Sequence, residues 1–131
     1  MPNAVDTNVL LRFLVDDGSA HVEPARRIFS EGPVFLSLSV MLETEWVLRS
    51  NFGFQREQIC DAFDRLLGLG SITVQEVRVV ESAVDACRNG MDFADAMHLN
   101  SSTDCDIFYT FDRKLVRKAN QTTSTILVKE P

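Results

Sequence analysis

The segment Ala-Val-Asp-Thr-Asn-Val-Leu-Leu-Arg-Phe-Leu, residues 4–14, decides the fold. Its first two residues indicate a short buried strand, and the apolar run 9–14 indicates a helix that begins directly after a polar turn. A strand that leads at once into a helix is the repeating unit of α/β domains. Asp6 is therefore expected at the carboxyl end of a strand, where the functional sites of such folds lie.

The same alternation continues along the chain. Short apolar runs bounded by turn residues predict further strands at 34–36, 72–74, 107–110 and 125–128. Apolar residues at helical spacing predict helices at 21–31, 40–51, 56–67, 79–88, 92–103 and 113–119. This order predicts an α/β fold with a mainly parallel sheet. No linker, repeat or low-complexity tract interrupts the sequence, so we expect a single domain over residues 1–131.

The composition is that of a soluble globular protein. The chain has 131 residues, of which 45% are hydrophobic and 24% charged, proportions that exclude a disordered chain. No apolar run approaches the roughly 20 residues that span a bilayer, so no membrane partner is expected. The N-terminal residues lack a basic segment followed by an apolar stretch, so no signal peptide is indicated and a cytoplasmic location is expected.

The cysteines suggest neither disulfides nor zinc. Cys60, Cys87 and Cys105 are odd in number, widely spaced and outside any Cys-x-x-Cys or Cys-His pattern. Because reduced cysteines are among the most frequently buried residues, we expect all three in the core.

The charge is unevenly distributed. The formal net charge of -6 argues against nucleic acid as a partner, since nucleic-acid-binding proteins usually carry a basic face. Residues 111–131, however, hold five basic residues against two acidic ones. Arg113 and Lys114 are the first residues of the helix predicted in this region. If the substrate is a nucleic acid, they are the natural candidates for phosphate contacts. They could equally belong to an ordinary solvent-exposed helix face.

Four carboxylates are candidates for one site: Asp6, Glu43, Asp95 and Asp112. Asp6 and Asp112 follow predicted strands, and the other two lie near helix starts, so all four could face one crevice. Clustered carboxylates repel one another unless a cation holds them, so convergence predicts a divalent metal. Oxygen ligands in a chain with only two histidines favour Mg²⁺ or Mn²⁺ over Zn²⁺. Such metals activate water and neutralise charge on a phosphoryl group.

The surroundings of these four acids resemble the motifs of the PIN-domain family. The motifs are Val5–Leu11, Ser37–Leu48, Asp92–His98 and Tyr109–Asp112, and they occur in the family's order within residues 4–128. Each motif alone is weak, whereas four in order are specific. The resemblance implies a PIN-like three-layer α/β/α sandwich around a mainly parallel central sheet.

The resemblance also implies an activity. It implies a VapC-type endoribonuclease that uses Mg²⁺-activated water to hydrolyse phosphodiester bonds of single-stranded or structured RNA (tRNA, mRNA or rRNA) and leaves a 5′-phosphate. It further implies a homodimer that a small VapB-like antitoxin neutralises, as in a type II toxin–antitoxin pair. The chain departs from the family after the third acid, where Met97–Ser101 replaces the usual small residues, and this affects the expected substrate preference.

Several of these residues have ordinary structural explanations. Asp6, Asp92 and Asp112 can each cap a helix, and Thr7 and Asn8 can orient the turn around Asp6. We expect Asp92 to be mainly a cap or a supporting ligand. Thr110 can hydrogen-bond a carboxylate or a phosphate.

Other choices depend on which face of a helix a side chain occupies. Glu45 competes with Glu43 as the acid that this helix contributes to the site. Side chains two residues apart on a helix point in different directions, so only one of the two can serve, and the family pattern favours Glu43. We expect His98 to be packed or at the surface rather than a general base, and Trp46 to lie in the core or on a dimer surface rather than to stack on a base.

Three rival functions remain. The first is a degenerate PIN module that binds RNA or protein without cleaving it, but the presence of all four acids favours the enzyme. A haloacid-dehalogenase-like phosphatase needs a second Asp where Asn8 stands. A receiver domain needs paired acids before its first turn and a late Lys, where Asn3 and Asp112 stand.

Overall fold

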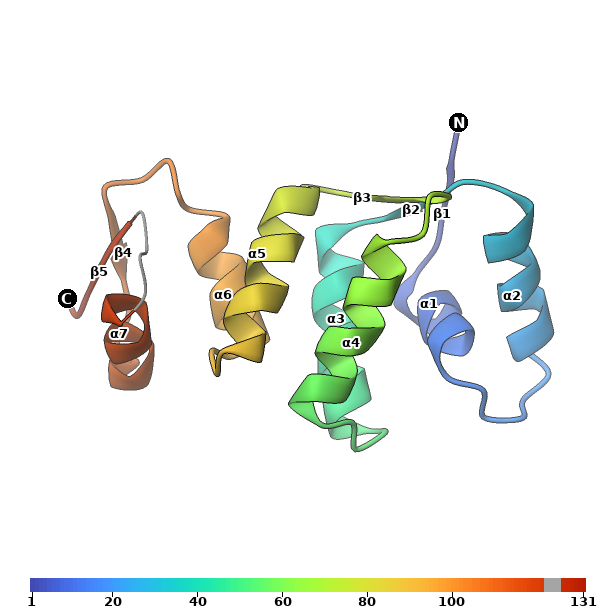
Figure 1. The fold of residues 1–131 in the computed structure, drawn as a ribbon, viewed down its shortest axis with the longest axis horizontal. Coiled ribbons are helices and arrows are strands. Elements are labelled where there is room, and N and C mark those ends of the chain that lie inside the picture. Colours follow the sequence, from blue (N-terminus) through green and yellow to red (C-terminus); the bar gives the residue numbers. More distant parts are fainter. Residues whose placement is uncertain (122–125) are drawn as a thin grey trace.

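The computed structural model describes residues 1–121 and 126–131 (Figure 1). Its strands are β1 Asn3–Ala4, β2 Val34–Leu36, β3 Ile72–Val74, β4 Ile107–Tyr109 and β5 Leu127–Lys129. Its helices are α1 Thr7–Leu14, α2 Val22–Glu31, α3 Leu38–Ser50, α4 Arg56–Leu67, α5 Val77–Arg88, α6 Phe93–Asn100 and α7 Arg113–Asn120. Strands and helices alternate, as predicted for an α/β fold.

Within the described residues, 1–121 and 126–131, every strand pair is parallel. β1, β2 and β3 form one sheet in that order, with Val34 of β2 opposite both Asn3 of β1 and Ile72 of β3. β4 and β5 pair as a second sheet, in which Phe108 lies opposite Val128. The prediction of a mainly parallel sheet in a PIN-like α/β fold is therefore confirmed, with the strands of the described part divided between two sheets.

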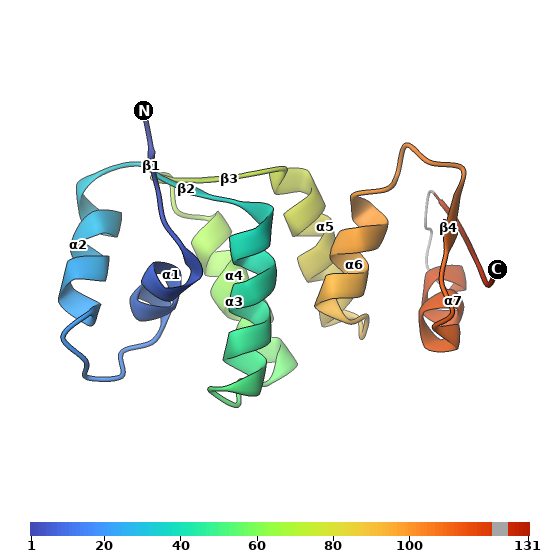
Figure 2. The same cartoon turned by 180° about the vertical axis from the view of Figure 1, so that it is seen from behind.

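The helices follow one another along the long axis of the molecule. α1 and α2 lie toward one end, α7 with β4 and β5 lies at the other, and the remaining helices lie between them in both views (Figures 1 and 2). α3 contacts α1 on one side and α6 on the other. The helices that follow β1 and β4 are thus separated by α3 and α6.

One cluster of buried side chains joins these elements. It runs from Leu10 of α1 through α3, α4 and α5 to Leu115 of α7 and Val128 of β5. Phe63 of α4 and Phe93 of α6 meet edge to face, with ring centroids 5.5 Å apart, a favoured geometry for aromatic pairs. Phe93 is the first residue of α6, so this contact fixes where that helix begins.

The predicted boundaries hold best where apolar spacing is strong. The strands 34–36 and 72–74 and the helix 56–67 match β2, β3 and α4 residue for residue. The helix predicted over 92–103 instead ends at Asn100. The Ser102 hydroxyl donates to the His98 carbonyl at 2.8 Å, and such side-chain bonds compete with helix continuation. Residue 125 of the strand predicted at 125–128 lies outside the described residues.

The cysteine prediction is right for two residues of three. Cys60 and Cys87 are buried, and burial raises the pKa of the Cys60 thiol to about 12, so it is neutral at physiological pH. Cys105 is exposed, which contradicts the expectation that it belongs to the core. It lies in the turn after α6, where its amide donates to the Ser102 carbonyl at 3.0 Å and the chain has left the apolar interior.

The helices are too short or too polar for a bilayer. None within residues 1–121 and 126–131 has the length and continuous apolar character that crossing a membrane requires.

Candidate functional site

Three of the candidate aspartates cap helix N-termini. Asp6 accepts a hydrogen bond from the Val9 amide at 3.1 Å at the start of α1. Asp92 accepts one from the Asp95 amide at 3.1 Å at the start of α6. Asp112 accepts two at the start of α7, from residues 114 and 115 at 2.9 and 3.2 Å. The capping roles anticipated for these residues are therefore present, and each carboxylate also lies at the positive end of a helix dipole.

Asp95 occupies the first turn of α6 and is half-buried. Burial raises the pKa of its carboxyl above the ordinary value, and the carboxylates of Asp92 and Asp112 raise that pKa further, whereas His98 lowers it. Carboxylates from α6 and from the turn before α7 are therefore within electrostatic reach of each other. A cation placed among them would reverse this effect, because it favours the charged form.

Glu43 and Glu45 have different environments on α3. Glu43 is exposed, whereas Glu45 is buried with 5% of its surface accessible. The Glu45 carboxylate pairs with the Arg49 guanidinium one turn later, at 2.9 Å, and Arg49 in turn lies near enough to Asp92 to feel its charge. Glu45 is thus engaged in a structural ion pair, and Glu43 is the glutamate of this helix that stays open to a ligand.

The four predicted acids lie on elements in a row. Asp6 precedes α1, Glu43 lies on α3, Asp95 on α6, and Asp112 precedes α7. α1 and α7 lie toward opposite ends of the molecule in both views (Figures 1 and 2). Within residues 1–121 and 126–131, no group of three or more His, Cys, Asp or Glu side chains is close enough to hold a metal ion. The structure brings the acids of α6 and α7 near each other and does not gather all four.

The donors themselves suit a hard cation. Every candidate ligand is a carboxylate, and the mutual effect of Asp92, Asp95 and Asp112 is the repulsion that a divalent ion relieves. The chemistry of the donor set therefore fits Mg²⁺ or Mn²⁺, while the arrangement of the described side chains supplies no complete set of ligands.

Residues 4–121 match the family model described as PIN domain. This chain belongs to the PIN-domain family. PIN domains are generally nucleases, and they typically use divalent metals. A search of curated proteins finds no match to this chain.

The residues predicted to support the acids of this PIN domain lie in the turns next to them. Thr7 is buried in the first turn of α1, and Asn8 beside it is exposed. The Thr110 hydroxyl accepts a hydrogen bond from the Asp112 amide at 3.0 Å, so Thr110 fixes the turn between β4 and α7. Thr110 thus orients the backbone around Asp112.

The basic residues of α7 differ in their availability. The Arg113 side chain is 81% exposed and pairs with Glu130 at 3.0 Å, a surface ion pair that solvent weakens. Lys114 is exposed. Lys118 donates to the Asn89 carbonyl at 3.1 Å and so attaches α7 to the end of α5. Arg117 is exposed as well, in the last turn of α7, whereas Arg113 and Lys114 are the exposed basic residues next to Asp112.

A groove between α3 and α6 was not anticipated. It measures about 440 Å³ and is lined by Ser39, Glu43 and Trp46 of α3 and by Ala94 and His98 of α6. Trp46 is 54% exposed, so the expectation that it could belong to the core is wrong. His98 is exposed, in agreement with its predicted surface position. The three-residue spacing of Glu43 and Trp46, which places both on one helix face, is the sequence signal for this groove.

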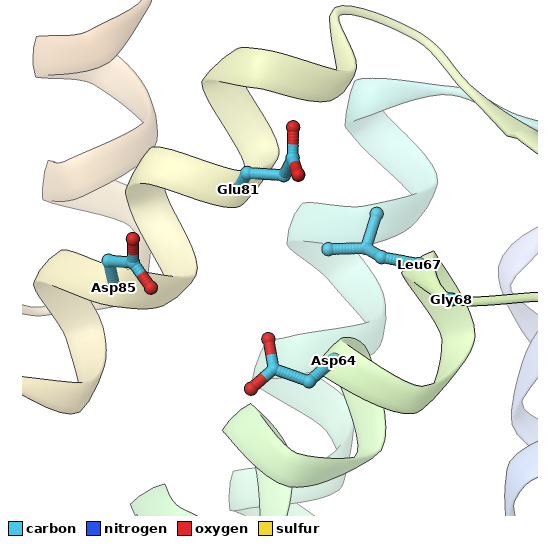
Figure 3. Close-up of a pocket in the computed structure, with 5 residues that line it drawn as sticks. All are labelled: Asp64, Leu67, Gly68, Glu81 and Asp85. Atoms are coloured by element: carbon cyan, nitrogen blue, oxygen red, sulfur yellow. The ribbon is translucent and has the colours of Figure 1, made fainter.

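A second hollow, of about 300 Å³, lies between α4 and α5 (Figure 3). Asp64 projects into it from α4, and Glu81 and Asp85 project from α5 (Figure 3). Asp64 is already bound by Arg88, whose guanidinium nitrogen lies 2.6 Å from it. This hollow contains none of the four predicted acids, so it is separate from the candidate site.

Proposed function

We propose that this PIN domain is a Mg²⁺-dependent endoribonuclease and the toxin of a type II toxin–antitoxin pair. Its substrate is single-stranded or structured RNA, its antagonist is a small VapB-like antitoxin, and it acts in the cytoplasm as a homodimer. The observation that carries the nuclease assignment is the match of residues 4–121 to the PIN domain, a family that is generally nucleolytic. The four acids in motifs that resemble those of the family, with Asp92 and Asp112 within electrostatic reach of Asp95, support it.

The acids would hold the cation, with Mn²⁺ as a substitute for Mg²⁺. Asp6, Glu43, Asp95 and Asp112 are the proposed ligands, and metal binding would have to draw them closer together than the described structure places them. Asp92 supports Asp95 through the bond to its amide. When bound, the metal supplies a water of lowered pKa and neutralises charge on the scissile phosphate.

The remaining residues bind and orient. Arg113 and Lys114 are exposed at the start of α7, directly after Asp112, and they would contact the RNA backbone next to the cleaved bond. Thr110 holds the turn that presents Asp112. Thr7 and Asn8 occupy the first turn of α1, directly after Asp6, and would support it there.

One observation favours a second candidate. Because the described side chains include no group of three potential ligands, a PIN module that binds RNA or protein without cleaving it also fits the structure. The two candidates differ in whether RNA is hydrolysed when Mg²⁺ is present.

Cleavage of labelled tRNA and mRNA by the purified chain tests the proposal, with Mg²⁺, with Mn²⁺ and with EDTA. We expect cleavage only with metal, and a loss on the order of 10² to 10³ in rate for Asp6→Asn and Asp95→Asn, the size found when one electrostatic group leaves an active site. Asp104→Asn is the matched control, because Asp104 is an exposed aspartate in the turn after α6.

Cleavage that persists in EDTA contradicts the metal-dependent mechanism. Cleavage by Asp6→Asn and Asp95→Asn at the rate of the wild type contradicts it as well. No cleavage with either metal selects the non-cleaving module. The toxin role has a separate test: expression of the chain should stop growth, and co-expression of a short DNA-binding protein from the adjacent reading frame should restore it.

A further inference from the structure

The groove between α3 and α6 adjoins the proposed catalytic acids. Glu43, a proposed metal ligand, forms part of its wall, and Ala94, which precedes Asp95 in the chain, forms part of the opposite wall. Any group that occupies this groove therefore lies beside the position where a phosphodiester bond would be cut. The nucleotide next to that bond is the group that a nuclease must accommodate at such a place.

The lining of the groove favours a neutral planar ligand. The Trp46 ring is half exposed, and Leu42 and Ala94 add apolar surface next to it. The charge of Glu45 is matched by Arg49, which leaves the exposed Glu43 carboxylate to set the charge of the groove. A phosphate would be repelled there, whereas an uncharged aromatic base would bury apolar surface against the indole ring.

The rim of the groove supplies polar side chains that can hydrogen-bond the edge of a planar base. Ser39 and His98 are both exposed and stand on opposite walls, one on α3 and one on α6. Unpaired RNA bases are recognised by stacking on aromatic rings and by hydrogen bonds to their edges. The volume of about 440 Å³ is within the range of small-ligand sites.

We propose that the α3–α6 groove is a subsite for one unpaired nucleobase of the RNA, which stacks on Trp46 while Ser39 and His98 hydrogen-bond its edge. The proposal rests on the proposed ribonuclease function, and it deepens that function by naming the residues that select the nucleotide beside the cleaved bond. Met97–Ser101, the segment in which this chain departs from its family's pattern, includes His98.

Trp46 is the single tryptophan of the chain, so the emission of the whole protein reports on this groove. The test uses the Asp6→Asn variant of the whole chain, which is expected to cleave RNA far more slowly and keeps a residue that can cap α1. Single-stranded RNA hexamers, each of one base type, are titrated against it, beside an abasic hexamer with the same number of phosphates. We expect the hexamers to quench Trp46 saturably, with different affinities for different bases, and the abasic hexamer to leave the emission unchanged.

Variants in the same background measure the stacking. Binding of a fluorescently labelled hexamer, followed by anisotropy, should weaken roughly tenfold or more for Trp46→Ala. Trp46→Phe, which keeps an aromatic face, should recover part of that loss. Leu69→Ala is the matched control, because Leu69 is another exposed large apolar residue and lies in the turn between α4 and β3, outside the groove.

Equal binding by Trp46→Ala, or equal quenching by the abasic hexamer, overturns the subsite. The subsite is also overturned if Trp46 emission shifts with protein concentration and sedimentation shows a dimer that Trp46→Ala disrupts. That result would assign the groove to a second copy of the chain. Cleavage by the wild type without quenching removes this subsite and leaves the nuclease intact. Quenching without cleavage supports the subsite and removes the nuclease.

Discussion

The first turns of α6 and α7 share the same type of N-terminal cap, but the side chains that surround the two caps differ. Each helix begins after an aspartate that caps it, Asp92 in one case and Asp112 in the other. The aromatic residue beside the cap is 2% exposed at α6, as Phe93, and 83% exposed at α7, as Phe111. The start of α6 is fixed by packing, whereas the start of α7 depends on turn hydrogen bonds and solvent-exposed contacts.

The comparison explains why the acids behave differently. Asp95 rests on a packed helix start, and its carboxyl is half-buried with a raised pKa. Asp112 stands on an exposed turn that Thr110 holds. If both residues bind the metal, Asp95 would be a ligand in a fixed position and Asp112 a ligand that can adjust its position.

The largest expected effect is on the free energy of unfolding, when the aromatic residue beside each cap is replaced by alanine. Phe93→Ala should lower the free energy of unfolding by about 3 to 5 kcal/mol, because it removes a fully buried ring and its contact with Phe63. Phe111→Ala, which changes the exposed aromatic residue just before the α7 cap, should change it by less than about 0.5 kcal/mol. Urea unfolding of both variants measures the difference, and similar losses would show that the two starts are equally packed.

An intermediate effect is expected from the ion pairs beside the two starts. Arg49→Met leaves the buried Glu45 carboxylate without its partner and should cost about 2 kcal/mol, between the values for buried and exposed pairs. Arg113→Met, whose pair with Glu130 is exposed, should cost less than about 0.5 kcal/mol.

The double variant Glu45→Gln with Arg49→Met provides the control for the first pair. It should recover part of the loss, since no uncompensated charge stays buried. If thermal melts of the Arg49 and Arg113 variants coincide, Glu45 is not held in the buried state described.

The smallest effect is expected from the caps. Asp112→Ala should cost about 1 kcal/mol, because two amides of α7 lose their acceptor, whereas Asp112→Asn should be nearly neutral in stability. The same Asn variant should still lose nuclease activity if Asp112 binds the metal. Unfolding and cleavage assays on one preparation separate the two roles, and full activity of the Asn variant would reduce Asp112 to a cap.

The sequence predicted most of the fold because its strongest signals are local. The apolar spacing of 56–67 gives the observed α4, since it depends on residues within a few positions of each other. The helix predicted over 92–103 is too long by three residues, because the Ser102 side chain competes for the backbone and bonds the His98 carbonyl.

The site was less accessible to sequence reasoning. The motifs located Asp95, and the family match agrees with the fold they imply. The burial of Glu45 beside the exposed Glu43 could not be predicted, because both glutamates share a face with apolar residues and helical periodicity does not separate them. The exposure of Trp46 depends on how α3 packs on α6, a long-range contact. Whether the four acids share one ion stays a prediction.

The caps at the starts of α1, α6 and α7 restrict which amino acids can replace the aspartates. Asparagine retains the short acceptor that holds the helix end and gives up the negative charge. Glutamate retains the charge, but its extra methylene carries the acceptor away from the amides that Asp6, Asp92 and Asp112 reach. At a position that must both begin a helix and attract a cation, aspartate alone satisfies the two demands, so random mutagenesis with selection for activity should recover no other residue there.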